Sequence, residues 1–125
     1  MERLYLATML ALIVHQIDAA YWHEWDMFAV PGGIQGFLIF NACAIGMLLW
    51  GYRSVLQRQR SAKVWAQVCG GLGVGTCALH AAFALSGRPE FSLPLSIVTL
   101  VGCCISGGCL LIAAHRLHAI EHRRA

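Results

Sequence analysis

Two polar side chains interrupt the first apolar stretch of the chain, His15 and Asp18. Residues three apart share one face of a helix, so the two side chains would project side by side. A histidine beside a carboxylate is a usable acid and base near neutral pH. We therefore predict that His15 and Asp18 are catalytic residues that act on, or bind, a small lipophilic molecule.

The elements that position this pair are four long apolar blocks. The chain has 125 residues, of which 58% are hydrophobic and 12% are charged, whereas soluble domains carry roughly 25% charged residues. About 20 apolar residues suffice for a helix to cross a bilayer, and each block has about that length. We predict an all-α, four-transmembrane-helix bundle, a single integral membrane domain over residues 1–125. Its spans are expected at about 4–21, 34–52, 64–85 and 93–114.

The charged residues predict how this bundle is oriented. The second loop and the C-terminal tail are basic, whereas the first loop is acidic. The basic residues are Arg53, Arg58, Arg60, Lys63, Arg116, Arg123 and Arg124, and the acids are Glu24 and Asp26. By the positive-inside rule both termini are cytoplasmic, which fits a bacterial inner membrane. A nucleic-acid partner is not expected, and block 4–21 is read as an uncleaved span because it lacks a clear small-x-small cleavage site.

Depth in the bilayer predicts which polar side chains meet. At about 1.5 Å per residue, His15 and Asn41 both lie about 3 Å to the non-cytoplasmic side of the midplane. Asp18 and His80 both lie about 7 to 8 Å to that side, and Cys77 falls between the two layers. We therefore expect a polar pocket in the outer half of the bilayer.

The rim of the pocket follows if the first helix continues beyond residue 21. At about 100° per residue, Trp22 and Trp25 then extend the face of His15, while Glu24 points nearly opposite. Trp22, Trp25, Asn41 and His80 are accordingly the predicted pocket residues.

Three interpretations of the pocket stay open. The polar side chains could form a structural network, since buried polar groups need partners. They could instead form the catalytic or proton-handling site described above. The third interpretation is a metal or haem site, for which the acceptable ligand types are His15, Asp18, Cys77 and His80. The sequence names no cofactor.

A second candidate metal site lies in the tail. His115, His118 and His122 share one helix face, but a basic helix end explains them without a ligand.

The small residues of the last two blocks predict close helix contacts. Gly71 and Gly75 have G-x-x-x-G spacing, and Gly102, Gly107 and Gly108 follow in the fourth block. Small residues let helices approach closely in lipid. The alternative function is therefore a non-enzymatic membrane subunit or assembly factor that packs against a partner or a second copy through these helices.

The six cysteines of the chain all lie within predicted spans, where they behave as small hydrophobes. Because the chain contains no C-x-x-C motif, a thiol oxidoreductase is disfavoured.

The run HQIDAAYWHEWDMFAVPGGIQGFLIFN, residues 15–41, resembles an uncharacterised family of small four-helix bacterial membrane proteins. A more distant resemblance is to the HXXEE membrane family, named for a histidine followed by paired acids. Here His15 and Asp18 occupy the first two places, but Ala19 stands at the second acid. Chemistry that needs two carboxylates would have to recruit Glu24 or Asp26. Both resemblances imply the fold, and neither implies an activity.

Overall fold

The computed structural model describes the backbone of residues 1–88 and 90–124, and the side chains of residues 1–88 and 90–116. Within this part the chain is helical, without strands. Its helices are α1 (Glu2–Tyr21), the single-turn α2 (Glu24–Met27), α3 (Ile34–Leu56), α4 (Ala62–Leu85) and α5 (Pro94–Arg124). Four of the described helices are long and apolar enough to cross a membrane, and α5 is so over Pro94–Arg116. The predicted all-α fold is confirmed, together with four helices of the expected length and apolar composition.

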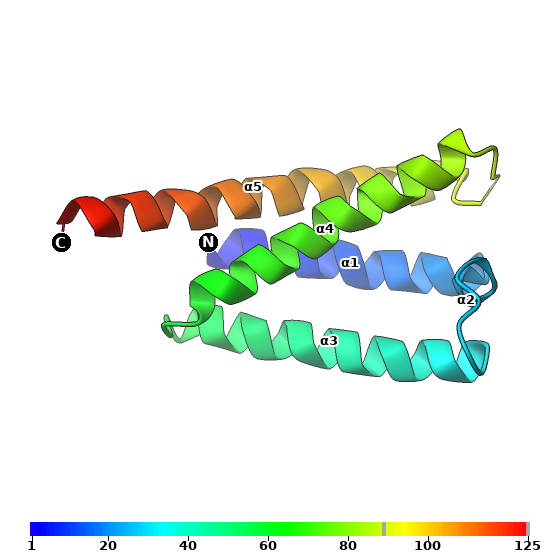
Figure 1. Cartoon of the computed structure of the whole chain (residues 1–125), viewed down its shortest axis with the longest axis horizontal. Helices are drawn as coiled ribbons and strands as arrows, with labels where there is room; N and C mark the ends of the chain where they lie inside the picture. The colour runs from blue at the N-terminus through cyan, green and yellow to red at the C-terminus, as the bar shows by residue number, and fades with distance from the viewer. Residues whose placement is uncertain (89, 125) are drawn as a thin grey trace.

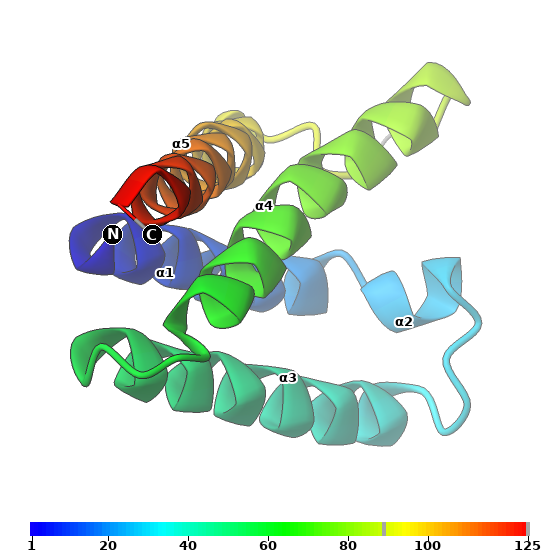
Figure 2. The same ribbon diagram turned by 60° about the vertical axis from the view of Figure 1, so that its left-hand side comes forward.

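Helices α1 and α4 form the centre of the arrangement, since each packs against all three other long helices. The most extensive contact is between α4 and α5, and α3 touches the bundle through α1 and α4 (Figures 1 and 2). The start of α1, the α3–α4 loop and the far end of α5 lie at one end of the bundle (Figure 1). Helix α2 and the α4–α5 connection lie at the other end, which we call the α2 end.

Glycines allow α4 and α5 to approach closely, as the small residues of these two blocks predict, although the contact does not use the pair with G-x-x-x-G spacing. A Cβ added at Gly107 would lie 2.7 Å from the Gly70 carbonyl oxygen, and one at Gly73 would lie 2.7 Å from the Cys103 carbonyl oxygen. Gly71 and Gly75, by contrast, have open space around them. The close contact therefore uses the neighbouring face of α4, and the G-x-x-x-G face points out of the molecule.

Two groups of buried apolar residues hold the bundle together. The larger lies in the half that contains the termini, where the buried Tyr5 hydroxyl donates to the Leu48 carbonyl at 2.9 Å. The smaller comprises Ala19, Phe37 and Phe91, near the α2 end. The polar side chains of interest lie beside this smaller group.

The first helix does not continue past Tyr21, so the extension of its helical wheel to later residues is wrong. His23 adopts a left-handed conformation with φ 52°, and α2 begins immediately afterwards in a new direction. The connection then passes through Gly32 and Gly33, with φ 83° and 56°, which glycine tolerates without a steric penalty. This turn leads directly into α3, which begins at Ile34.

Candidate functional site

Three buried side chains from three helices meet near the α2 end: His15 of α1, Glu24 of α2 and His80 of α4. One ligand atom of each lies within 4.8 Å of the other two. Nε2 of His80 is 3.2 Å from Oε1 of Glu24, and the two imidazole rings are 4.7 Å apart in an edge-on arrangement. Equal depth predicts His15 beside Asn41 and Asp18 beside His80, whereas in the structure His15 meets His80. The carboxylate comes from Glu24, a residue that the helical wheel directed away.

The break at His23 explains why Glu24 faces inward. A continuous helix would carry residue 24 to the far side of α1, but the left-handed residue redirects the chain and α2 turns Glu24 into the bundle. His23 itself stays exposed. Left-handed conformations cost a non-glycine residue of the order of 1–2 kcal/mol, so the bundle has to hold this break through packing.

The hydrogen bonding of His80 determines which of its nitrogens faces Glu24. Its Nδ1 is 2.9 Å from the Thr76 carbonyl oxygen. Because a carbonyl can only accept, Nδ1 carries the hydrogen. In the neutral ring Nε2 then presents a lone pair toward the Glu24 carboxylate, and two acceptors would face each other across 3.2 Å. A proton shared between the two groups, or a bound cation, would remove this repulsion.

Phe91 covers the cluster. Its ring centroid is 4.3 Å from that of His80 in an edge-on contact and 5.5 Å from that of His15. Phe91 is buried and has a left-handed φ of 63°. It was not anticipated from the sequence, since a lone phenylalanine in a loop gives no signal of such a role.

A cavity of about 350 Å³ opens beside the cluster. Its walls are mainly apolar and come from α1, α3, α4 and the loop after α2. The lining residues are His15, Gln16, Glu24, Phe28, Val30, Phe37, Phe40, Thr76, Leu79 and His80. A smaller cavity of about 120 Å³ shares Gln16, Phe40 and Thr76 with it and leads deeper between α1, α3 and α4. Both cavities have mainly apolar walls, and the 350 Å³ cavity is called the recess below.

Asp18 does not belong to this cluster. Its Oδ1 accepts a hydrogen bond from the Ser96 hydroxyl at 3.0 Å, and the Ser96 oxygen accepts one from the Trp22 indole at 3.3 Å. Among the described contacts, Asp18 therefore does not pair with His15 as expected. Its hydrogen bond with Ser96 instead connects α1 to α5. Ser96 is almost fully buried, but a serine in an apolar helix carries no sequence signal that would have revealed this role.

The remaining predicted residues are dispersed around the site. Asn41 is buried and donates to the Phe37 carbonyl of its own helix. Trp25 packs against Phe37 in a tilted arrangement, with ring centroids 5.4 Å apart. Cys77 lines a separate cavity on the other face of His80. None of the three supplies a ligand atom to the His15–Glu24–His80 cluster.

The tail histidines stay largely untested. His115 is exposed, and the side chains of His118 and His122 lie outside the described residues.

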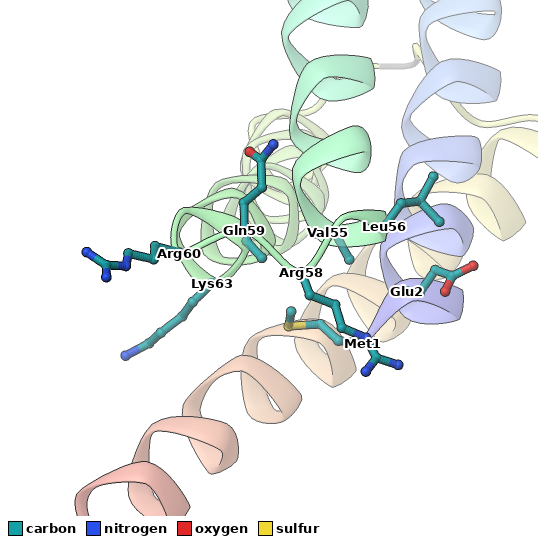
Figure 3. A pocket seen from close by; sticks show the side chains of 9 residues that line it. Met1, Glu2, Val55, Leu56, Arg58, Gln59, Arg60 and Lys63 are labelled. Atoms are coloured by element: carbon teal, nitrogen blue, oxygen red, sulfur yellow. The ribbon is translucent and has the colours of Figure 1, made fainter.

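The largest cavity, about 780 Å³, lies at the opposite end beside the α3–α4 loop. Figure 3 shows Arg58 extending toward Met1, while Arg60 and Lys63 point away from the bundle. Arg58 and Arg60 are exposed to solvent, and the lining of this cavity contains no buried titratable side chain. We therefore place the candidate site at the α2 end, where the titratable groups are buried.

The described fold and cluster can now be set beside known proteins. A family model described as a family of unknown function, DUF6713, matches residues 1–117. The chain belongs to the DUF6713 family. The match includes all three residues of the cluster. No curated protein and no solved structure matches the chain, and the resemblance to the HXXEE family stays a prediction.

Proposed function

We propose that this DUF6713 protein binds a small amphiphilic molecule within the membrane, with the polar end of the ligand at the His15–Glu24–His80 cluster. The observation that supports this function is a set of unpartnered polar atoms around one cavity. His15 Nδ1, Gln16 Oε1 and His80 Nε2 are all buried without a hydrogen-bond partner, and all three residues line the 350 Å³ cavity.

Such atoms are costly in a protein that serves only as a scaffold. Each buried polar group without a partner costs about 1–3 kcal/mol, and the cost falls away when a ligand supplies the missing hydrogen bonds. Ionisable residues inside a membrane are also uncommon unless they serve a function. The concentration of three unpartnered atoms at one wall therefore supports a bound ligand with a hydrogen-bonding end.

The other walls of the cavity are apolar, so we expect the rest of the ligand to be apolar as well. The cavity volume lies within the range of roughly 300–1,000 Å³ that is typical of small-molecule sites. Phe40 and Leu79 line the cavity while also being exposed on the outer face of α3 and α4. In a bilayer this face contacts lipid, so a lipophilic ligand can enter sideways from the membrane.

The charge distribution supports an orientation for this site. Arg53, Arg58, Arg60 and Lys63 lie at or near the loop end that also contains the chain termini, and the positive-inside rule makes that end cytoplasmic. The cluster then lies in the outer half of the bilayer. We propose the bacterial inner membrane as the location, in keeping with the resemblance of residues 15–41.

If the bound molecule is also transformed, the acid and base are His15 and His80 with Glu24 rather than His15 with Asp18. Glu24 is within contact distance of His80, whereas Asp18 is engaged by Ser96. Asp18 then acts as a positioning residue that fixes α1 against α5.

Native mass spectrometry of protein extracted in mild detergent tests the binding function. We expect a small lipophilic molecule to be retained by the wild-type protein and lost in Leu79→Trp, which fills the cavity. Leu85→Trp is the matched control, because Leu85 lies on the same helix but does not line this cavity. Retention of the same molecule by Leu79→Trp, or a wild-type protein that carries none when extracted from its native membrane, would contradict the proposal.

The alternative, a non-enzymatic subunit, is supported by the outward face of α4. Gly71 and Gly75 have G-x-x-x-G spacing and nothing packed against them in the described structure, and such faces associate in membranes. Cross-linking in native membranes should then capture a partner or second copy in the wild type and lose it in Gly75→Leu. An unchanged pattern in Gly75→Leu would exclude this face as the interface.

A further inference from the structure

We infer that His15, Glu24 and His80 form a binding site for one divalent transition-metal ion. The site lies where α1, α2 and α4 meet, and it offers two imidazoles and one carboxylate. This donor set occurs in catalytic zinc sites and in non-haem iron sites, both of which keep coordination positions free for another ligand.

The burial of the three side chains argues that the cluster is built rather than accidental. His15, His80 and Glu24 are exposed by only 1%, 5% and 7%. Their ligand atoms converge to within 4.8 Å. In a tetrahedral site with bonds of about 2.0–2.1 Å, neighbouring ligand atoms are about 3.3 Å apart. The 3.2 Å between His80 and Glu24 already matches that spacing, and only a modest approach by His15 completes the site.

The orientation of His80 is that of a metal ligand. Metal-bound histidines almost always donate their second ring N–H to a carbonyl or carboxylate, which fixes the tautomer and the ring. His80 does this through Nδ1 and the Thr76 carbonyl at 2.9 Å. Its Nε2 is thereby held toward Glu24 with a lone pair available for coordination.

Glu24 and His15 each offer a further ligand atom beside His80. The Nε2 of His80 and Oε1 of Glu24 are 3.2 Å apart, and imidazole and carboxylate groups are ligands that transition metals accept. His15 Nδ1, buried and unpartnered, adds a further donor that an isolated His80–Glu24 pair would not need.

The open side of the cluster is the 350 Å³ cavity, which all three residues line. A bound ion would therefore have protein ligands on one side and free coordination positions toward the cavity. The metal inference concerns the same site as the proposed function but does not require the lipophilic ligand. The Leu79→Trp variant separates the two, because it fills the cavity and leaves all three metal ligands in place.

The test is a titration of Zn²⁺ into chelator-treated protein that carries no polyhistidine tag, in detergent, by calorimetry and by elemental analysis after dialysis. We expect about one Zn²⁺ per chain. Single replacement of a ligand in His15→Ala, Glu24→Gln or His80→Ala should lower the affinity by more than about 100-fold, beyond the 10–100-fold effect typical of residues outside the coordination sphere. Fe²⁺ and Mn²⁺ are titrated in parallel, and Mg²⁺ is the negative control.

Asp26→Asn is the matched variant, because Asp26 is an exposed acid on the same helix as Glu24, and its affinity should equal that of the wild type. Co²⁺ binding is measured as well, because the visible absorption of the ion reports its nitrogen and oxygen ligands. Replacement of a residue that only supports the fold would leave this absorption unchanged. Folding of each variant is checked by circular dichroism. The inference is overturned if folded wild-type protein binds none of the three transition metals, or if Glu24→Gln is folded and binds Zn²⁺ as well as the wild type does. Zinc binding by Leu79→Trp without the lipophilic molecule would support the metal site alone.

Discussion

Replacement of His15 by phenylalanine should stabilise the metal-free protein. His15 is exposed by only 1% and its Nδ1 has no hydrogen-bond partner. A buried polar group in this state costs about 1–3 kcal/mol, and phenylalanine removes that cost. We therefore expect the free energy of unfolding to rise by about 1–3 kcal/mol in His15→Phe.

Two effects that could reduce this gain in stability are expected to be small. Aromatic pairs contribute about 0.5–1.5 kcal/mol beyond their buried area, and a phenyl ring keeps the contacts with His80 at 4.7 Å and Phe91 at 5.5 Å. The slightly larger ring has room because residue 15 borders the 350 Å³ cavity. Overpacking, which can cost about 1–3 kcal/mol in a filled core, is therefore not expected here.

The assay is equilibrium unfolding in detergent after treatment with a chelator, followed by tryptophan fluorescence. Ile17→Phe, at an exposed position of the same helix, is the control and should stay within about 0.5 kcal/mol of the wild type. Addition of Zn²⁺ should reverse the order of stability, because a bound ion stabilises only the protein that retains its ligands. Destabilisation of the chelator-treated His15→Phe protein by 1 kcal/mol or more, on the order of a lost hydrogen bond, would refute the reasoning and identify His15 as part of a structural network.

Three further predictions concern the scaffold. Gly107→Leu should destabilise the α4–α5 contact by several kcal/mol, because even a Cβ would lie 2.7 Å from the Gly70 carbonyl oxygen. Gly108 faces open space, so Gly108→Leu should be neutral in the same unfolding assay. Equal effects of the two variants would argue against this packing. Ser96→Ala removes the donor to the Asp18 carboxylate and should cost about 1.5–3 kcal/mol without changing Zn²⁺ affinity; a loss of metal binding would show that Asp18 belongs to the site. A reporter fused to the C-terminus should read as cytoplasmic, and an external signal would contradict the proposed orientation.

The sequence was sufficient to predict the long helices and some of the residues in the candidate site. Long apolar blocks limit a chain to few architectures, and the observed helices begin within a few residues of the expected spans. Helix α5, however, continues to Arg124, ten residues past the expected end at 114. The equal depth of polar residues on different helices is a real but coarse constraint. It placed His15 and His80 in the same region, although it could not specify which residues would touch.

The residues that were predicted wrongly depend on how each helix is rotated about its axis and on where a helix is interrupted. Glu24 was placed on the wrong side because the helical wheel assumed a continuous helix, and no glycine or proline marks the break at His23. Likewise, the spacing of Gly71 and Gly75 indicates a packing face but not the direction in which it points. These features depend on contacts between helices, which local sequence patterns do not encode.

The partly lipid-facing walls of the cavity have a consequence for how its occupancy should be measured. Phe40 and Leu79 are exposed by 59% and 43% on the outer surface of the bundle while lining the recess. A ligand that enters there equilibrates with the bilayer, not with the surrounding water. Occupancy is then governed by the mole fraction of the molecule among the lipids. A compound that is scarce in solution but enriched by partitioning can fill the site with modest intrinsic affinity.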